Sequence, residues 1–329
     1  MPVRKQFPLI LAVLVSLGML LAACGGAPTS IPALSTTPLP TGTALLPPPA
    51  TGAPTLTALP APSATSATAG LCFAVIGDFG EGGQAEADVA ALVHGWNPDI
   101  VITVGDDNYP SGAAETIDAH IGQYYHDYIY PYKGTYGPGA SQNRFFPTLG
   151  NHDWLAPGAK PYLDYFTLPG NRRYYDFVWG PVHFFALDSD ENEPDGVGKS
   201  SAQAGWLKQA MAASTSRWNV VYFHHAPYSS GMHGSTTWMR WPFKDWGADV
   251  VLTGHDHTYE RLLVDGLPYF VNGVGGGAIY DFVNILPESQ FRYNADYGAM
   301  LVDVTTAQMD FEFDNRKGER IDSAQLTKP

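Results

Sequence analysis

Cysteine, charge and long apolar runs are all scarce in this chain of 329 residues. Its two cysteines, Cys24 and Cys72, cannot build a disulfide framework. Charged residues make up 15% of the chain, and 18 Lys and Arg stand against 32 Asp and Glu, which gives a formal net charge of −14. This charge argues against nucleic acid as the main partner, because binding to phosphate backbones needs a basic face. The apolar run at 9–23 is too short to span a bilayer comfortably.

Aromatic residues, in contrast, reach 13% of the chain. That content excludes a wholly disordered protein and favours a rigid fold with a tail. The length allows one large domain or two ordinary ones.

The first 23 residues have the pattern of a signal peptide. Arg4 and Lys5 precede the apolar run at 9–23, which has the length of a signal-peptide core. The run ends in Leu-Ala-Ala before Cys24 and Gly25. This ending resembles the lipobox of bacterial lipoproteins, and the resemblance implies cleavage before Cys24 and acylation of its thiol. An ordinary secretory signal with an incidental cysteine is the alternative.

Residues 24–70 are predicted to be a lipidated cysteine followed by a disordered linker. Positions 25–70 hold ten Pro, ten Thr and ten Ala and no charged residue. Such a composition cannot bury a core, so we expect a partly extended spacer. Residues 71–329 remain for one large folded domain.

Within 71–329 the apolar pattern predicts strands with helices between the earlier ones. The expected strands are 71–76, 99–104, 144–149, 182–187, 218–223, 249–253, 259–264, 267–272, 297–304 and 307–313. The expected helices are 84–96, 201–213 and 238–246. In the first helix, Ala87, Ala90, Ala91 and His94 are expected to share one face.

Polar residues gather where the predicted strands end. The five motifs are Gly-Asp-Phe-Gly at 77–80, Gly-Asp-Asp-Asn-Tyr at 105–109, Gly-Asn-His-Asp at 150–153, Tyr-Phe-His-His-Ala-Pro at 222–227 and Gly-His-Asp-His at 254–257. In an open α/β sheet, sites form beyond the carboxyl ends of the strands. Asp, Asn and His delivered together to one edge indicate a metal site.

This set of motifs, in this order, resembles the calcineurin-like metallophosphoesterases and, among them, the purple acid phosphatases. The resemblance covers essentially all of 71–329. It implies an α/β fold, namely a four-layer α/β/β/α sandwich of two mixed β-sheets flanked by helices. It also implies two metal ions bridged by one carboxylate.

The resemblance assigns the ligands residue by residue. Asp106 would bridge the metals, and Asp78, Tyr109 and His257 would complete the first site. Asn151, His225 and His255 would complete the second site. Many metallophosphoesterases begin with Asp-x-His, but here the third position is Gly80. Tyr109, three residues after Asp106, instead matches the purple acid phosphatases and implies Fe(III) in the first site, with Fe(II), Zn or Mn in the second.

The fourth motif offers two candidate ligands. The family spacing Val-x-x-His, counted from Val221, selects His224, whereas the pattern His-x-Pro selects His225. We favour His225, because strand alternation would turn the His224 side chain the opposite way.

Two further histidines are expected to act on the substrate. His152, which follows Asn151, would hold the phosphoryl oxygens while a metal-bound hydroxide attacks phosphorus. His233 resembles the substrate-pocket histidine of the family and would protonate the leaving alkoxide. A solvent-exposed loop histidine is the alternative for His233.

Four nearby carboxylates are expected to have no role as metal ligands. Asp107 is expected to be a solvated loop residue, and Asp153, Asp256 and Asp188 are expected to be structural partners.

The sequence therefore predicts a phosphomonoesterase that acts on small phosphate esters, held by a lipid anchor on the membrane and facing the periplasm or exterior. A phosphodiesterase or nucleotidase on the same scaffold is one alternative. A tethered binding protein without turnover is another. The oligomeric state does not follow from the sequence.

Overall fold

The computed structural model describes residues 70–329. The predicted signal peptide, Cys24 and the linker up to position 69 lie outside the described residues, so their assignments stay predictions. None of the helices in 70–329 is long and apolar enough to cross a membrane.

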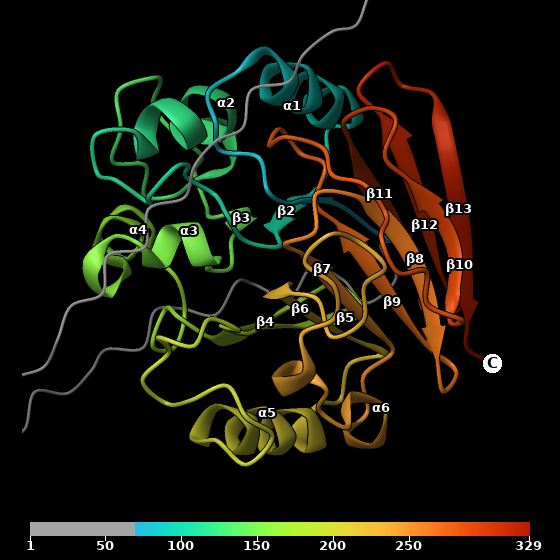
Figure 1. Cartoon of the computed structure of the whole chain (residues 1–329). Coiled ribbons are helices and arrows are strands. Elements are labelled where there is room, and N and C mark those ends of the chain that lie inside the picture. The colour runs from blue at the N-terminus through green and yellow to red at the C-terminus, as the bar shows by residue number, and fades with distance from the viewer. Residues whose placement is uncertain (1–69) are drawn as a thin grey trace, which may run out of the picture. The chain divides into compact units, whose positions relative to one another are not determined.

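Two mixed β-sheets form the centre of the described domain (Figure 1). In hydrogen-bonded order, the first sheet contains β13 (Arg320–Thr327), β12 (Gln308–Asn315), β11 (Gly298–Val304), β1 (Leu71–Ile76), β2 (Ile100–Thr103) and β3 (Phe145–Phe146). The second contains β10 (Ser289–Tyr293), β8 (Tyr259–Val264), β9 (Leu267–Asn272), β7 (Val250–Gly254), β6 (Trp218–His225), β5 (Val182–Ala186) and β4 (Tyr175–Trp179).

Six helices accompany the sheets in the described domain. They are α1 (Gln84–Trp96), α2 (Gln123–Tyr125), α3 (Asn151–Trp154), α4 (Lys160–Tyr165), α5 (Ala202–Ala213) and α6 (Phe243–Trp246). A π-helical turn (Asp118–Gly122) and 3₁₀ turns (His126–Tyr128, Pro157–Ala159 and Thr237–Met239) add to these. In Figure 1, α1 and α2 lie beyond the first sheet, and α5 and α6 lie beyond the second. The expected four-layer sandwich is confirmed.

Two apolar cores hold the layers together. Between the sheets, Phe73 of β1 meets Phe184 of β5 edge-on, with ring centroids 5.1 Å apart. The next residue of β5, Phe185, belongs instead to the core shared with α5 and α6. Because successive side chains of a strand point to opposite faces, both faces of β5 are buried. This explains why its sequence is apolar throughout.

Most expected elements are confirmed within a residue or two, and the exceptions have physical causes. The expected strand 144–149 is cut to the two residues of β3, and 238–246 is only partly helical. The unpredicted strands β4, β10 and β13 are three of the four edge strands of the two sheets. Edge strands expose one backbone side and carry polar residues, so they lack a clear apolar pattern.

The face expected for α1 is wrong in part. The residues it buries are Glu86, Val89, Ala90 and Val93, whereas Ala91 and His94 are exposed. The β-branched valines contribute more apolar area than alanines and set the buried face. Glu86 is buried as well, and its carboxylate accepts a hydrogen bond from the backbone N–H of Gly82 at 2.6 Å, which offsets part of the cost of burying it.

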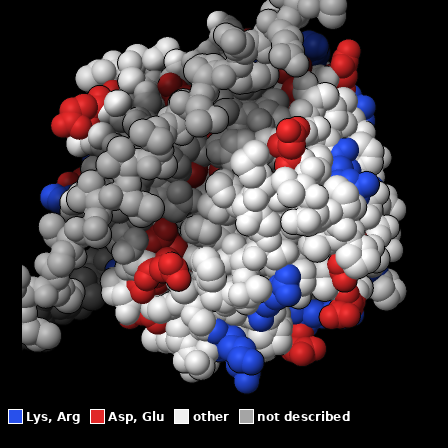
Figure 2. All heavy atoms as spheres, viewed as in Figure 1, with Lys and Arg blue, Asp and Glu red and all other residues white. Residues whose placement is uncertain are grey.

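Charges are dispersed on the face of the molecule drawn in Figure 2. Acidic and basic side chains there form small separate groups with uncharged residues between them.

Candidate metal centre

The site forms where parallel strands of both sheets end. β1, β2 and β3 run parallel in one sheet, and β5, β6 and β7 run parallel in the other. Asp78 and Asp106 follow β1 and β2, His224 and His225 end β6, and His255 follows β7 directly. Each motif therefore leaves its strand at a carboxyl end, as the sequence predicts.

One group of donors contains Asp78, Asp106, Tyr109 and His257. The Tyr109 hydroxyl lies 3.0 Å from Asp106 Oδ2, 2.9 Å from His257 Nε2 and 3.5 Å from Asp78 Oδ1. His257 Nε2 is 3.4 Å from Asp78 Oδ1. All four side chains are buried. Three anionic or phenolic oxygens with one imidazole suit a hard cation.

A second group contains Asn151, His224 and His255. His224 Nε2 lies 3.0 Å from Asn151 Oδ1 and 3.2 Å from His255 Nδ1. The other nitrogen of His224, Nδ1, lies 2.9 Å from the carbonyl oxygen of Val104. A proton on Nδ1 would be donated to that carbonyl, which leaves the Nε2 lone pair free for a metal.

Asp106 joins the two groups. Its Oδ2 faces the Tyr109 hydroxyl at 3.0 Å and His224 Nε2 at 3.4 Å. Burial alone would raise the pKa of Asp106. His224 and the backbone amide of His152 instead hold this pKa well below its usual value. Burial alone would lower the pKa of His224, but the carboxylates of Asp106 and Asp78 raise it to about 10. The negative charge of these carboxylates favours a proton on a histidine that is fully buried. The same charge would favour a metal cation in that place, so the two donor groups fit two metal ions.

The geometry favours His224 over His225 in the second group. The argument that His224 turns away was wrong, because the pairing of β6 with β7 shifts register between Tyr222 and His225. This irregularity interrupts strand alternation and lets both histidines approach His255, with ring centroids 5.0 and 4.4 Å from it. His225 Nδ1 lies instead 2.9 Å from the hydroxyl of Ser189. Burial, and then the neighbouring His224, lower the pKa of His225 to about 3.

Three donors have left-handed backbone conformations. The φ angles of Asp78, Asp106 and His255 are 54°, 53° and 72°. Such φ values strain residues other than glycine and persist only where neighbouring contacts fix them. Here the N–H of Asp78 donates to Gly105 O at 3.0 Å, and the N–H of His255 donates to Asp78 Oδ2 at 3.0 Å. Hydrogen bonds thus link the first motif to the second and to the fifth.

The two expected substrate histidines both border these groups. The His152 ring lies 4.4 Å from the Tyr109 ring, and its Nδ1 lies 2.6 Å from Pro110 O. The exposed His233 ring stacks on His255, with centroids 4.3 Å apart and planes 26° from parallel. The structure therefore brings His233 to the site.

Among the nearby carboxylates, the prediction for Asp107 as a solvated loop residue is wrong. Asp107 is completely buried, not solvated, and burial next to Asp153 raises its pKa well above the usual value. Asp153 accepts the backbone N–H groups of Gly150 and Asp107, at 2.9 and 3.2 Å. Asp256 accepts the N–H of His233 at 2.7 Å, and Asp188 accepts Trp154 Nε1–H at 2.9 Å. Asp153, Asp256 and Asp188 thus hold the loops that carry site residues.

Gly80 occupies the position where related motifs carry a histidine. A Cβ atom at Gly80 would meet the carbonyl oxygen of Asp107. The Gly80 carbonyl also accepts the backbone N–H of Tyr109 at 2.8 Å. The first motif is therefore packed against the second, and this packing leaves no space for a side chain at position 80.

Sequence reasoning missed three neighbours of the site. Tyr280 stacks on His257, with centroids 4.2 Å apart and planes 5° from parallel. Ser189 bonds His225, and Trp238 lies 5.9 Å from the His225 ring and donates its Nε1–H to Ser189 O. Ser189 and Tyr280 lie outside helices and strands, and Trp238 starts a segment predicted only as a helix, so tertiary structure is needed to identify all three.

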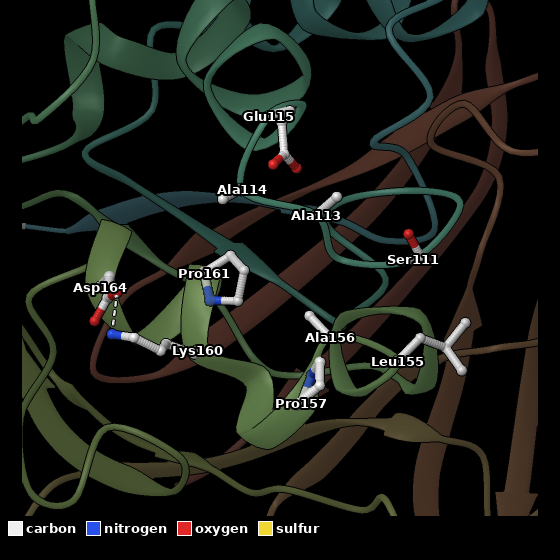
Figure 3. A pocket seen from close by; sticks show the side chains of 10 residues that line it. All are labelled: Ser111, Ala113, Ala114, Glu115, Leu155, Ala156, Pro157, Lys160, Pro161 and Asp164. Carbon is white, nitrogen blue, oxygen red and sulfur yellow. Dashed lines mark hydrogen bonds and ion pairs between the residues drawn. The ribbon is translucent and has the colours of Figure 1, made fainter.

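A separate pocket of about 520 Å³ lies beside the loops that follow Tyr109 and α3 (Figure 3). It is lined by Ser111, Ala113, Ala114, Glu115, Leu155, Ala156, Pro157, Lys160, Pro161 and Asp164. Figure 3 shows Lys160 paired with Asp164 at one side of it. None of the candidate ligands lines this pocket, so the chemistry belongs to the donor groups described above.

A sequence model of the calcineurin-like phosphoesterases matches residues 72–259. Purple acid phosphatase 17 of Arabidopsis thaliana is 24% identical over 244 residues, which cover 63% of this chain and 68% of the relative. Tartrate-resistant acid phosphatase type 5 of Mus musculus is 24% identical over 250 residues, covering 64% and 74%.

Among solved structures, a purple acid phosphatase from yellow lupin (Lupinus luteus) seeds superposes with a TM-score of 0.64 at 18% identity. The match covers 79% of this chain and 54% of the lupin chain. The chain therefore spans about half the length of that structure, and the likeness shows the shared fold.

Proposed function

Since the chain belongs to the calcineurin-like phosphoesterase family of metal-dependent hydrolases, we propose that it is a dinuclear-metal phosphomonoesterase of the purple acid phosphatase type. The observation that carries this proposal is the position of Asp106 between two donor groups. A single carboxylate oxygen that faces both groups is what two adjacent metal ions require.

The proposed first metal is held by Asp78, Asp106, Tyr109 and His257. The proposed second metal is held by Asp106 together with Asn151, His224 and His255. The phenol of Tyr109 favours Fe(III) in the first site, and the amide and two imidazoles suit Fe(II), Zn or Mn in the second. When bound, the ions would supply positive charge to the phosphoryl group and lower the pKa of the attacking water.

His152 is proposed to hold a phosphoryl oxygen. Its Nδ1 faces the Pro110 carbonyl at 2.6 Å and so carries a proton. Nε2 is then the nitrogen left for the substrate, and it donates a hydrogen bond when the ring is protonated.

His233 is proposed to protonate the leaving alkoxide. It is the exposed member of a stacked pair with the ligand His255, so it can exchange protons with solvent beside the reacting group. Its backbone is fixed by Asp256 at 2.7 Å, which keeps the ring over the site.

The test compares a nitrophenyl phosphate monoester with the bis-nitrophenyl diester. Purified residues 70–329, loaded with iron and zinc or manganese, are scanned from acid to alkaline pH. The proposal expects a strong preference for the monoester. A diester preference would replace the proposed substrate class, and no turnover with both metals bound would favour a binding protein.

We also propose that the domain acts outside the cytoplasm, tethered through acylated Cys24. The support is the sequence pattern around Cys24. Two acyl chains together are needed for stable membrane binding.

A further inference from the structure

Ser189 and His225 form a hydrogen-bonded pair at the border of the second donor group. Ser189 follows β5 and is completely buried, and His225 ends β6 with 7% of its surface exposed. The backbone N–H of His225 donates to Ser189 Oγ at 2.9 Å. The same oxygen lies 2.9 Å from His225 Nδ1.

These two contacts bear on which ring nitrogen of His225 carries the proton. A serine hydroxyl has one hydrogen, and a buried hydroxyl without an acceptor costs free energy. Within 70–329, His225 Nδ1 is the acceptor that the structure gives to the Ser189 hydroxyl. We therefore assign Nδ1 as the unprotonated acceptor of this hydroxyl, which puts the proton of a neutral His225 on Nε2.

This arrangement is the reverse of the one at His224. His224 turns Nδ1 to the Val104 carbonyl at 2.9 Å, which frees the Nε2 lone pair. His225 turns Nδ1 to a hydroxyl that donates to it, so its Nε2 is an N–H donor. A nitrogen that carries a hydrogen cannot bind a metal, whereas it can bind an anionic oxygen.

The ring of His225 also lies beside the second donor group, 4.4 Å from the His255 ring between centroids. One of its nitrogens is within 4.8 Å of a ring nitrogen of both His224 and His255. Among the described residues, Nε2 has no hydrogen-bond partner in the structure. The His225 ring therefore borders the second donor group, where the three histidines lie close enough to surround one bound group.

The surroundings of Ser189 make the pair rigid. The N–H of the preceding Asp188 donates to Gln203 Oε1 at 2.8 Å, and Gln203 Nε2 donates back to Asp188 O at 2.8 Å. On the other side, Trp238 Nε1–H donates to Ser189 O at 3.1 Å. Ser189 is fixed on both sides, and through it the His225 ring.

We propose that His225 is a substrate-binding residue that donates a hydrogen bond from Nε2 to a phosphoryl oxygen, and that Ser189 is the positioning residue that sets its tautomer. This inference rests on the proposed phosphoesterase function and adds a contact to it. The ligand class is a phosphate monoester or inorganic phosphate itself.

The test uses His225→Ala, His225→Gln, Ser189→Ala and Ser189→Thr in metal-loaded protein. A control is Ser214→Ala, because Ser214 Oγ also contacts a histidine outside the site, His183 Nδ1 at 3.0 Å, while its hydroxyl donates to Asn219 Oδ1 at 2.7 Å. Four quantities are measured: metal ions per chain, kcat, KM, and the inhibition constant of inorganic phosphate.

We expect His225→Ala to keep both metal ions while kcat/KM falls by about ten- to a hundredfold and phosphate inhibition weakens by a similar factor. His225→Gln, which retains an N–H donor, should recover part of the loss. Ser189→Ala should lose about three- to tenfold, and Ser189→Thr, which keeps the hydroxyl, should stay within about twofold of the wild type. Ser214→Ala should leave both constants unchanged.

Two results would overturn the inference. Loss of one metal ion in His225→Ala and His225→Gln would make His225 a ligand. Unchanged kcat/KM and phosphate inhibition in the His225 and Ser189 variants would make the pair merely structural.

Failure of the proposed function gives a different result, since the metal-loaded wild type would then hydrolyse no ester. Calorimetric binding of inorganic phosphate to the same proteins would still decide between a donor and a structural His225.

Discussion

The backbone N–H of His152 donates a hydrogen bond to Asp106 Oδ1 at 2.8 Å. One carboxylate oxygen is thereby engaged by the third motif, and the other, Oδ2, is left to face Tyr109 and His224. The contact also fixes the start of α3, from which Asn151 and His152 project. Asp106 therefore has two tasks, fixing the segment that carries Asn151 and His152 and linking the donor groups.

The substitution Asp106→Asn should affect only one of these two tasks. Asp106→Asn retains an oxygen for the His152 N–H but removes the charge that both metals would share. We expect loss of bound metal and a fall in kcat/KM of at least about a thousandfold, because metal assistance contributes several kcal/mol to catalysis. Metal content and hydrolysis are measured together, with the surface variant Asp164→Asn as control. A fully active Asp106→Asn protein would contradict the dinuclear proposal.

Tyr109 offers a spectroscopic prediction. If it binds Fe(III), the iron-loaded protein has a visible tyrosinate-to-iron absorption band, and Tyr109→Phe loses it. The ring contact with His152, 4.4 Å between centroids, does not need the hydroxyl, so the variant should stay folded. Absorbance spectra of both proteins at equal iron content test this. A band of equal strength in Tyr109→Phe would assign the colour to another group.

The lipid anchor is tested at Cys24. Cys24→Ser removes the thiol that acylation needs, so we expect the full chain to move from the membrane fraction to the soluble extracytoplasmic fraction. The measurement is fractionation of cells that express each chain, together with the mass of the purified N-terminal peptide. Unchanged membrane association of the variant would mean that another part of the chain anchors it.

Strands with a run of apolar residues or a clear turn beside them could be predicted from the sequence, and the polar edge strands could not. The bounds of β8 and β9 match their predicted ranges, because the turn between them, with Asp265 and Gly266 at φ 51° and 75°, separates two apolar runs. β13 has mostly exposed or half-buried positions, so its sequence shows no apolar pattern typical of a strand. Its antiparallel hydrogen bonds with β12 hold it in the sheet. Edge strands of this kind depend on tertiary contacts.

The residues of the site also fall into those that the sequence predicts and those that it does not. Residues such as Asp78, Asp106 and His255 were predictable, because each follows an apolar strand within a glycine-containing motif. The preference between His224 and His225 was not, because it depends on a register shift in the β6–β7 pairing. Tyr280 and Ser189 approach from loops, where no periodicity indicates which residues will meet.

Gly80 supplies a stability prediction. Gly80→Ala puts a Cβ against the Asp107 carbonyl, so we expect a loss of about 3 kcal/mol in the free energy of unfolding. The control is Gly83→Ala, where a Cβ meets no atom within 4 Å and φ is −97°. It should change stability by less than about 1 kcal/mol. Urea unfolding of both variants measures the difference, and equal midpoints would show that the contact between the first two motifs relaxes freely.

Asp118 carries the pH prediction. Its carboxylate accepts hydrogen bonds from the hydroxyls of Tyr132 and Tyr165, at 2.6 and 2.8 Å, and from the N–H of Thr135 at 2.9 Å. Burial alone would raise the pKa of Asp118, but these bonds lower it below its ordinary value of 3.8. A lowered pKa in the folded state means that the carboxylate stabilises the fold above about pH 4. This contribution is lost as the pH falls through the folded-state value.

Asp118→Asn should therefore destabilise the domain by about 1 kcal/mol at pH 7, because it replaces charged acceptors by a neutral amide. The difference in Tm between wild type and variant should shrink as the pH is lowered from 6 towards 3, since protonation removes the same charge from the wild type. Thermal unfolding across this range measures the difference. Asp118 belongs to none of the donor groups, so the metal content of the variant should equal that of the wild type. A Tm difference that stays constant with pH would mean that the hydroxyl contacts stabilise the fold through packing and not through the carboxylate charge.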